Sequence, residues 1–203
     1  MRQNKLLAVA MAFLAVLPVL AQKTKRIYVA RPGTMVEMLT EEEANEITPL
    51  QLQGKLNAVD FRHLRDEFKQ LRSLDVSQAT ITLYAGKNGT RNGFHVYPAN
   101  VLPSHAFCKQ RDEYAYVGKE TLRRVILPGG LKEIGEAAFK GCDKLGICQI
   151  RDTKVPRLSS EALADSLTTI FVPEGSSNAY RSREEWKPFA CIEGEPTSVK
   201  VQI

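Results

Sequence analysis

Aliphatic residues recur along the chain at a regular spacing. One frame of six residues occurs five times. It has an aliphatic residue at position 1, an apolar residue at position 4 and an aliphatic residue at position 6. The five copies are Ile47/Leu50/Leu52, Leu71/Leu74/Val76, Leu122/Val125/Leu127, Leu145/Cys148/Ile150 and Leu167/Ile170/Val172. Successive frames lie 24, 51, 23 and 22 residues apart, so we expect a degenerate sixth strand at 93–98 within the long interval. Inward and outward positions alternate within each frame, which predicts short strands.

A second signature follows the strands. After the strand that ends at Leu127 come a proline and a series of small or apolar residues, namely Pro128, Leu131, Ile134, Ala138, Phe139, Gly141 and Cys142. The pair Ala138-Phe139 is echoed by Ala106-Phe107 and by Ala162-Leu163. Units that bury aliphatic residues only against their neighbours predict a coil of stacked turns, with these pairs opposite the strands. The alternative is an ordinary mixed domain in which the apolar spacing arises by chance.

The segment 122–142 resembles the repeat of bacterial leucine-rich repeat proteins of the BspA-like surface-protein type, and 170–189 is similar to the C-terminal ending of that family. The resemblance covers roughly residues 47–192 and is weaker between 77 and 120. It implies an α/β fold, a right-handed leucine-rich repeat solenoid of short parallel strands with turns and short helices. It also implies a secreted or surface-displayed protein that serves adhesion or recognition without catalysis.

The N-terminal residues have the pattern of a secretory signal peptide. A basic head, Met1–Lys5, precedes an apolar run that ends at a small residue, Ala21. An apolar run of about 15 residues is short for a membrane-spanning helix, which needs roughly 20, and a membrane anchor is the alternative. We therefore expect a secreted, periplasmic or cell-surface protein with no membrane span once residues 1–21 are removed.

The rest of the chain divides into three expected parts. These are an N-terminal cap at 22–46, the leucine-rich repeat solenoid at 47–173 with insertions near 85–93 and 109–120, and a C-terminal cap and tail at 174–203. Caps are expected at both ends because the terminal turns of a solenoid would otherwise expose apolar surface.

Helix signals support both caps. Thr40–Glu43 fits a capping box, and Asn57 starts a second helix whose apolar positions continue to Leu71. At the other end, we expect a helix from Ser176 or Ser177 to Glu185. The only tryptophan, Trp186, would follow it and, with Phe189, cover the last turn of the core.

The charge balance argues against nucleic acid as a partner. The 203 residues include 28 basic and 23 acidic side chains, a formal net charge of +5. This charge falls to +3 when Arg2 and Lys5 leave with the signal peptide. Such a small excess does not provide the basic surface that a phosphate backbone requires.

The segment 85–93 predicts a hairpin connection. It contains two Asn-Gly pairs and lies between two runs rich in strand-forming residues. Its Gly-Lys-Asn-Gly-Thr order lacks the Gly-Lys-Ser/Thr pattern and the following helix of a phosphate-binding loop.

Catalytic and metal-binding motifs are not recognisable in the sequence. The three histidines, His63, His95 and His105, form no pair at metal-ligand spacing, and no Cys-x-x-Cys occurs. His63 is expected on the solvent face of its helix, and helix capping explains the acidic run Glu41–Glu43. We therefore expect a non-enzymatic protein without cofactor or metal. An enzyme assembled from distant residues is the alternative.

Four cysteines in an exported chain raise the question of disulfides. Cys142 and Cys148 occupy repeat positions that we expect to be buried, so both act as small hydrophobic residues. A bridge between Cys108 and Cys191 stays open.

The strand register predicts which side chains face outward. If Leu50 and Leu52 point into the core, Gln51 between them points outward. The same alternation in the other frames gives two rows of outward-facing side chains. One row is Gln51, Asp75, Ile126, Gln149 and Phe171, and the other is Pro49, Ser73, Arg124, Ile147 and Thr169. Apolar residues with a polar rim are typical of a recognition patch, although packing across strands explains Ile147 and Phe171 equally well.

These observations predict an exported, non-enzymatic leucine-rich repeat binding module. Its expected partner is an extracellular protein or glycan at the bacterial cell surface. The expected binding face consists of Gln51, Asp75, Arg124, Ile126, Ile147, Gln149, Thr169 and Phe171. The alternative is a structural or assembly component of a surface complex without a soluble ligand.

Overall fold

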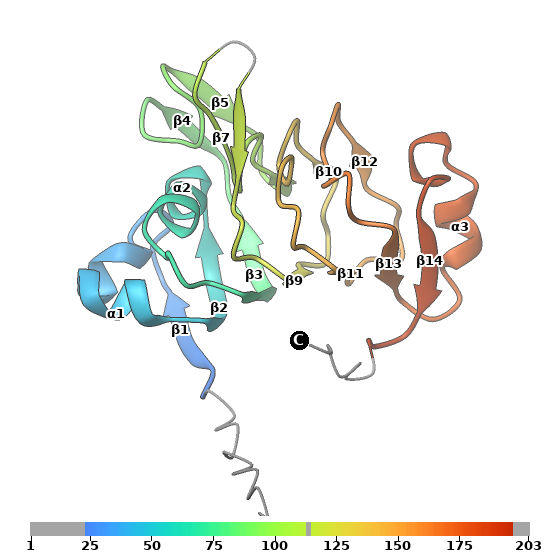
Figure 1. The fold of residues 1–203 in the computed structure, drawn as a ribbon, viewed down its shortest axis with the longest axis horizontal. Coiled ribbons are helices and arrows are strands. Elements are labelled where there is room, and N and C mark those ends of the chain that lie inside the picture. Colours follow the sequence, from blue (N-terminus) through green and yellow to red (C-terminus); the bar gives the residue numbers. More distant parts are fainter. Residues whose placement is uncertain (1–22, 113–114, 197–203) are drawn as a thin grey trace, which may run out of the picture.

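The computed structural model describes residues 23–112 and 115–196, so the expected signal peptide at 1–21 and the last residues of the tail lie outside the described residues. The fold is mixed α/β and contains one large parallel sheet (Figure 1). Its strands are β1 (Lys25–Val29), β2 (Pro49–Leu56), β3 (Ser73–Ile81), β9 (Arg124–Leu127), β11 (Ile147–Ile150), β13 (Thr169–Val172) and β14 (Ala190–Glu193). They lie in the order β1-β2-β3-β9-β11-β13-β14.

Smaller sheets form from the remaining strands of the described residues. A parallel sheet contains β6 (Val101–Leu102), β10 (Glu133–Ile134) and β12 (Arg157–Leu158). Two antiparallel hairpins pair β4 (Tyr84–Gly86) with β5 (His95–Tyr97) and β7 (Cys108–Gln110) with β8 (Tyr116–Gly118). The first hairpin confirms the connection predicted for 85–93.

All five aliphatic frames contribute a strand to the large sheet, namely β2, β3, β9, β11 and β13. Their central residues are backbone partners on neighbouring strands and form one column, which consists of Leu50, Leu74, Val125, Cys148 and Ile170. Every member of this column is at most 1% exposed, and all belong to one continuous hydrophobic core. The period of the sequence therefore predicts the register of the sheet.

The expectation of a sixth strand at 93–98 in this sheet is wrong. β3 pairs directly with β9, while β5 pairs with β4. An interior strand of a parallel sheet needs aliphatic side chains toward the core. This segment instead alternates His95 and Tyr97 around Val96, which is 62% exposed. The sheet gains a further strand from β14, which the sequence pattern did not predict because its four residues show no repeat frame.

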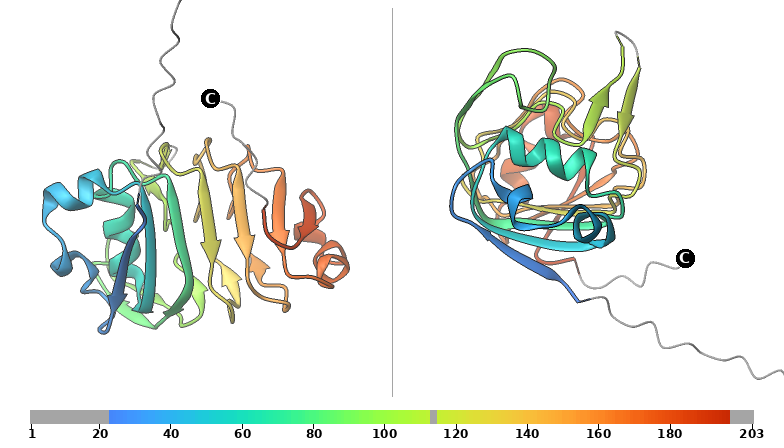
Figure 2. Two further views of the ribbon diagram at one scale, coloured as in Figure 1. Left: turned by 90° about the horizontal axis from the view of Figure 1, so that it is seen from below. Right: turned by 90° about the vertical axis from the view of Figure 1, so that its left-hand side faces the viewer.

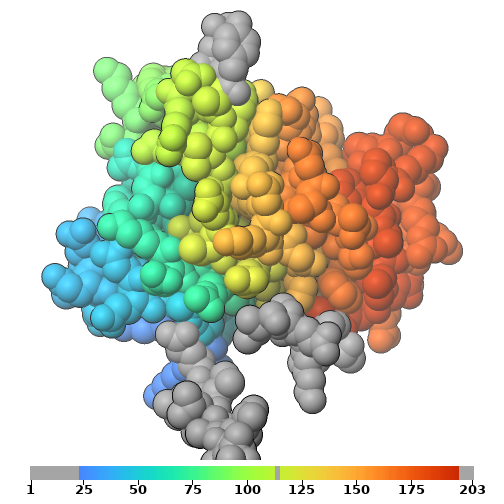
Figure 3. All heavy atoms as spheres, viewed as in Figure 1, coloured from blue at the N-terminus to red at the C-terminus, as the bar shows by residue number. Residues whose placement is uncertain are grey.

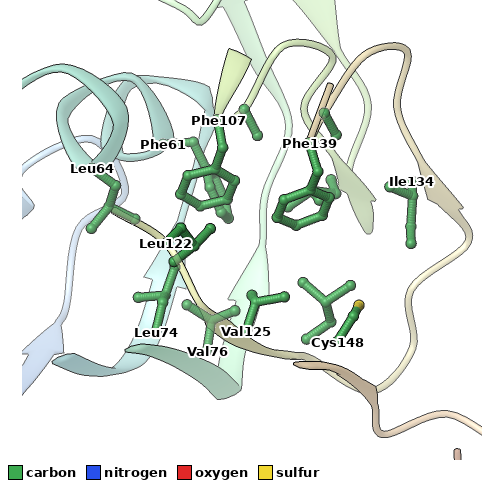
Figure 4. Close-up of a cluster of buried hydrophobic side chains, with 14 of the residues drawn as sticks. Phe61, Leu64, Leu74, Val76, Phe107, Leu122, Val125, Ile134, Phe139 and Cys148 are labelled. Carbon is green, nitrogen blue, oxygen red and sulfur yellow. The ribbon is translucent and has the colours of Figure 1, made fainter. Parts of the chain in front are cut away.

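Aromatic residues face the sheet across the core. Phe107 and Phe139 stack with ring centroids 5.2 Å apart, and Phe61 meets Phe107 edge-on at 6.1 Å. Figure 4 shows these rings on one side of the cluster and the strand residues on the other. The amide of Phe107 donates to the carbonyl of Ala138 at 2.8 Å, and the amide of Phe139 donates to that of Ala162 at 3.0 Å. The Ala-Phe pairs thus lie opposite the strands, as the pattern predicts.

Short helices cover the N-terminal end of the core (Figure 2). They are η1 (Met35–Met38), α1 (Glu41–Glu46) and α2 (Ala58–Asp66). Capping boxes are present at Thr40, as predicted, and at Asn57. α2 ends at Asp66, earlier than the apolar pattern to Leu71 predicts, and the chain continues through a turn in which the amide of Leu71 donates to the carbonyl of Phe68 at 3.1 Å. Both of these side chains remain fully buried.

The C-terminal end of the core is closed by α3 (Ser177–Arg181) and η2 (Glu184–Trp186). The indole N–H of fully buried Trp186 donates to the carbonyl of Pro156 at 2.8 Å, and the Tyr180 ring meets the indole edge-on at 5.1 Å. The Ser176 hydroxyl donates to the carbonyl of Pro173 and does not cap α3. The tryptophan closes the core, as predicted.

Candidate functional site

The outer surface of the large sheet carries a continuous row of side chains in register. We call it the outer row, and its members from β1 to β14 are Arg26, Gln51, Asp75, Ile126, Gln149, Phe171 and Ile192. The five central members are those that the sequence predicts. They face outward because the residues on either side of them in each strand point into the core.

A second row lies beside the outer row. Pro49, Ser73, Arg124 and Ile147 are backbone partners from β2 to β11. Thr169 begins β13, where it pairs with Ala190 of β14. The structure thus brings all eight residues of the expected binding face onto one surface of the sheet.

The side chains in the middle of the outer row are buried. The expectation that Ile126 is part of an exposed apolar patch is therefore wrong. Ile126 is 7% exposed and Gln149 is 3% exposed, whereas Phe171 is half-buried and Ile192 is 47% exposed. Strands in a sheet lie about 4.8 Å apart, so side chains on neighbouring strands cover one another. Contact with a partner would therefore begin at the β13 and β14 end of the row.

Polar groups in the outer row differ in how well they are paired. The Gln51 side-chain amide donates to the Asp75 carboxylate at 3.1 Å, and that carboxylate also accepts the Ser77 amide at 2.9 Å. The Gln149 side-chain oxygen is buried and has no hydrogen-bond partner within the described residues. Leaving such an acceptor unpaired costs about 1–3 kcal/mol, so it marks a point where a donor from outside would stabilise the surface.

The chain beyond β14 turns back toward β11. The Glu195 carboxylate lies 2.5 Å from the guanidinium of Arg151, which directly follows β11, and Pro196 is buried. One corner of the outer surface is therefore bordered by a segment of the same chain.

Metal-binding clusters of three or more His, Cys, Asp or Glu side chains do not occur among residues 23–112 and 115–196. The expectation that His63 faces solvent is wrong. Its ring nitrogen lies 2.5 Å from the Glu67 carboxylate one helical turn later, and its side chain is 15% exposed. This pairing at i and i+4 holds the ring against α2.

All four cysteines are buried and free, so Cys108 and Cys191 are not bridged. Burial raises the pKa of Cys108 to about 11 and the pKa values of Cys142 and Cys148 to about 12. These thiols are protonated at neutral pH and lack the thiolate character of a reactive cysteine.

A second cluster of charged and polar side chains, which the sequence pattern did not predict, lies around the two hairpins. The Arg65 guanidinium donates to the carbonyls of Thr90 at 2.7 Å and His105 at 2.9 Å, and it pairs with Asp66 at 2.9 Å. Arg65 thereby joins α2 to the β4–β5 loop and to the turn before β7. These partners are 25 and 40 residues away along the chain, so no local signal in the sequence could have revealed them.

Arg65 also lines a cavity of about 270 Å³ together with His95 and His105. Nearby, the Lys119 ammonium group donates to the Arg65 carbonyl at 3.1 Å. Burial lowers the pKa of Lys119 to about 8, because the charged ammonium loses hydration that this single contact only partly replaces.

Within the described part of the chain, no helix combines the length and the apolar character needed to cross a bilayer. In comparisons with known proteins, the chain matches no protein-family model and no curated protein.

Proposed function

We propose that this chain is an exported, non-enzymatic binding module whose outer sheet surface contacts a protein or glycan at the bacterial cell surface. The observation that carries the proposal is the unpaired, buried oxygen of Gln149, which lies in register between Ile126 and half-buried Phe171. An unpaired acceptor between two apolar side chains is an arrangement that a partner bearing a hydrogen-bond donor would complete.

We further propose that the mixed α/β fold is a right-handed leucine-rich repeat solenoid. Hydrogen bonds between equivalent points of successive units support stacked turns. The Lys132 amide donates to the Asn100 carbonyl at 2.7 Å, and one unit later the Arg157 amide donates to the Lys132 carbonyl at 2.9 Å. The end-on view of Figure 2, in which successive segments overlie one another, agrees with this arrangement. Parallel crossover connections are almost always right-handed.

The size and chemistry of the outer row suit a recognition surface. Seven strands about 4.8 Å apart give a row on the order of 30 Å long, enough for a protein loop or a short glycan. Phe171 and Ile192 provide apolar contact at one end, while Gln51 and Asp75 provide polar contact toward the other. Interfaces commonly combine apolar contacts with polar contacts beside them.

A capture experiment with two matched variants tests this proposal. The purified chain is immobilised and exposed to an array of glycans and to a panel of purified extracellular matrix proteins. Phe171→Ser should lower capture of the recognised ligand at least tenfold. Phe94→Ser removes the same ring from the hairpin region, where Phe94 is 62% exposed, and should leave capture unchanged. Equal capture by the two variants would contradict the proposed face.

An assembly component is the second candidate function. It is favoured by the two edge strands of the large sheet, since β1 pairs only with β2 and β14 only with β13 among the described strands. Unpaired edges of parallel strands are templates for adding another chain. Light scattering over a concentration series separates the two candidates, because an assembly component should form stable oligomers on its own.

A further inference from the structure

The two hairpins and α2 line a cationic cavity. We call it the hairpin cavity; its volume is about 270 Å³, and its principal lining residues are Arg65, Arg91, Asn92, His95, His105 and Lys109. None of the described residues that line it is acidic. The hairpins that contribute most of these residues form the green and yellow-green upper part of the molecule in Figure 3, away from the orange and red C-terminal part.

Acidic side chains near the hairpin cavity neutralise its cations only in part. Asp66 pairs with Arg65 at 2.9 Å and is directed to that guanidinium. Glu136 lies 3.9 Å from the Arg91 guanidinium, which is a long ion-pair distance. Lys109 is exposed at the rim and forms no ion pair within residues 23–112 and 115–196, although the charge of Asp66 also acts on it. The cavity therefore keeps a positive potential that favours an anion.

His105 provides a second, independent sign of a ligand. Its ring is buried, lines the cavity and stacks on the Tyr116 ring at 5.9 Å, and its Nδ1 has no hydrogen-bond partner within the described residues. Its backbone adopts a φ of 60°, and Ala137 and Glu161, which directly precede the corresponding pairs of the next two units, adopt φ values of 50° and 51°, so this conformation belongs to the repeated turn. Two hydrogen bonds hold this conformation, from its amide to Glu136 and from Arg65 to its carbonyl.

The electrostatics of His105 agree with an anion site. Burial lowers the pKa of His105, and the charges of Arg91, Arg65 and Lys140 lower it further, whereas Glu136 acts in the opposite direction. The lowered pKa favours the neutral ring at neutral pH, and an anion bound beside it would favour its protonated form.

We propose that the hairpin cavity binds a small ligand that carries a carboxylate, and specifically one acidic monosaccharide unit. The Arg91 guanidinium and the Lys109 ammonium supply the charge for the carboxylate, with Arg91 able to bind it through two parallel hydrogen bonds. The side-chain amide of Asn92 both donates and accepts, which suits the hydroxyls of a sugar ring. The volume is slightly below the 300–1,000 Å³ typical of drug-sized ligands, so the cavity accommodates a single sugar.

This site does not depend on the proposed function of the sheet. Phe171→Ser should leave sugar binding in the hairpin cavity unchanged, so the two proposals fail separately.

Calorimetric titration of the purified chain with glucuronate and N-acetylneuraminate tests the assignment. We expect dissociation constants of about a millimolar or tighter for at least one of these sugars, and no binding of glucose. The double variant Arg91→Gln/Lys109→Gln should weaken binding at least tenfold. The control Lys87→Gln/Arg111→Gln removes the same charge from the same two hairpins, at exposed residues that do not line the cavity, and should bind as the original chain does.

NMR titration of the histidine side chains adds a measurement that would not change if Arg91 and Lys109 had only a structural role. Saturating sugar should raise the pKa of His105 in the original chain. Inorganic phosphate and sulfate are titrated in parallel, and tighter binding of either ion than of both acidic sugars would overturn the sugar assignment. Failure of both sugars to bind, or equal loss of affinity in the test and control variants, would overturn the site itself.

Discussion

The sheet side and the hairpin side of this molecule are built in different ways. On the sheet side, each strand pairs with the strand of the next unit, so Leu74 contacts the same kind of neighbour as Val125 does. On the hairpin side, Arg65 joins segments that share no repeat with one another. Regular side-chain rows suit contact along an extended surface, whereas the irregular hairpins create the enclosed, cationic cavity. The two sides therefore present different surfaces, an extended row of side chains on one and a cavity lined by cations on the other.

Removal of a core side chain on the sheet side should have the largest effect on stability. Leu74→Ala removes a fully buried side chain from the central column and should lower the free energy of unfolding by about 2–5 kcal/mol. Leu83 is 62% exposed in the turn after β3, so Leu83→Ala should cost less than about 0.5 kcal/mol. Urea unfolding measures both values, and similar losses would contradict a continuous core at Leu74.

Breaking the contacts of Arg65 tests the hairpin side directly. Arg65→Met leaves the carbonyls of Thr90 and His105 without this donor and should cost about 2–4 kcal/mol. Hydrogen exchange should accelerate in β5 and β7 far more than in β11 and β13. The control Arg31→Met changes an arginine whose side chain is 80% exposed and should alter neither stability nor exchange. Uniform acceleration across both sides would contradict a separate role for Arg65.

Lys119 gives the hairpin side a pH dependence. Its pKa is about 8 in the folded chain against an ordinary value of 10.5, so the unfolded chain holds this proton to higher pH. The contribution of Lys119 to the free energy of unfolding should therefore rise between pH 8 and 10.5. Unfolding of the original chain and of Lys119→Met is compared across this range. The original chain should gain on the order of 1–2 kcal/mol relative to the variant, and a constant difference would contradict the buried charge.

The smallest effect is expected from Glu193 at the C-terminal edge of the sheet side. Its pKa is lowered to about 2, because the hydroxyl of Ser177 and the amides of Gly175 and Ser177 donate to the carboxylate. The resulting stabilisation is present above pH 4.5 and is lost as pH falls toward 2. Glu193→Gln should thus be slightly less stable at pH 7 and equal to the original chain near pH 2. Thermal unfolding at both pH values measures this difference, and an equal difference at both would contradict the role.

The sequence predicts the sheet side well because the repeat controls its geometry. The spacing of Leu50, Leu74, Val125, Cys148 and Ile170 predicts one column, and the structure has that column. The same pattern predicts the members of the outer row but not their exposure. The exposure of a side chain depends on how far the side chains of neighbouring strands cover it. Ile126, for example, belongs to the outer row but is only 7% exposed.

The hairpin side could not be predicted in the same way. Its contacts join Arg65 to backbone carbonyls, which every residue has, so the sequence contains no distinctive partner to find. The buried state of His105 depends on β8, because the ring rests on Tyr116, and β8 lies beyond a second hairpin turn. The expectation of a strand of the large sheet at 93–98 was wrong because it relied on the position of this segment within the repeat spacing. Its side chains, His95, Val96 and Tyr97, do not supply the buried aliphatic residues of the other strands.

The central claim is that units distant in sequence lie next to one another in a single ordered sheet. Nuclear Overhauser contacts in the folded chain test it most directly, because β3 and β9 are separated by the two hairpins. We predict contacts between the amide regions of Leu74 and Val125 and none between Leu74 and Val96. Contacts from Leu74 to Val96, with none to Val125, would place the hairpin segment inside the sheet and contradict the account.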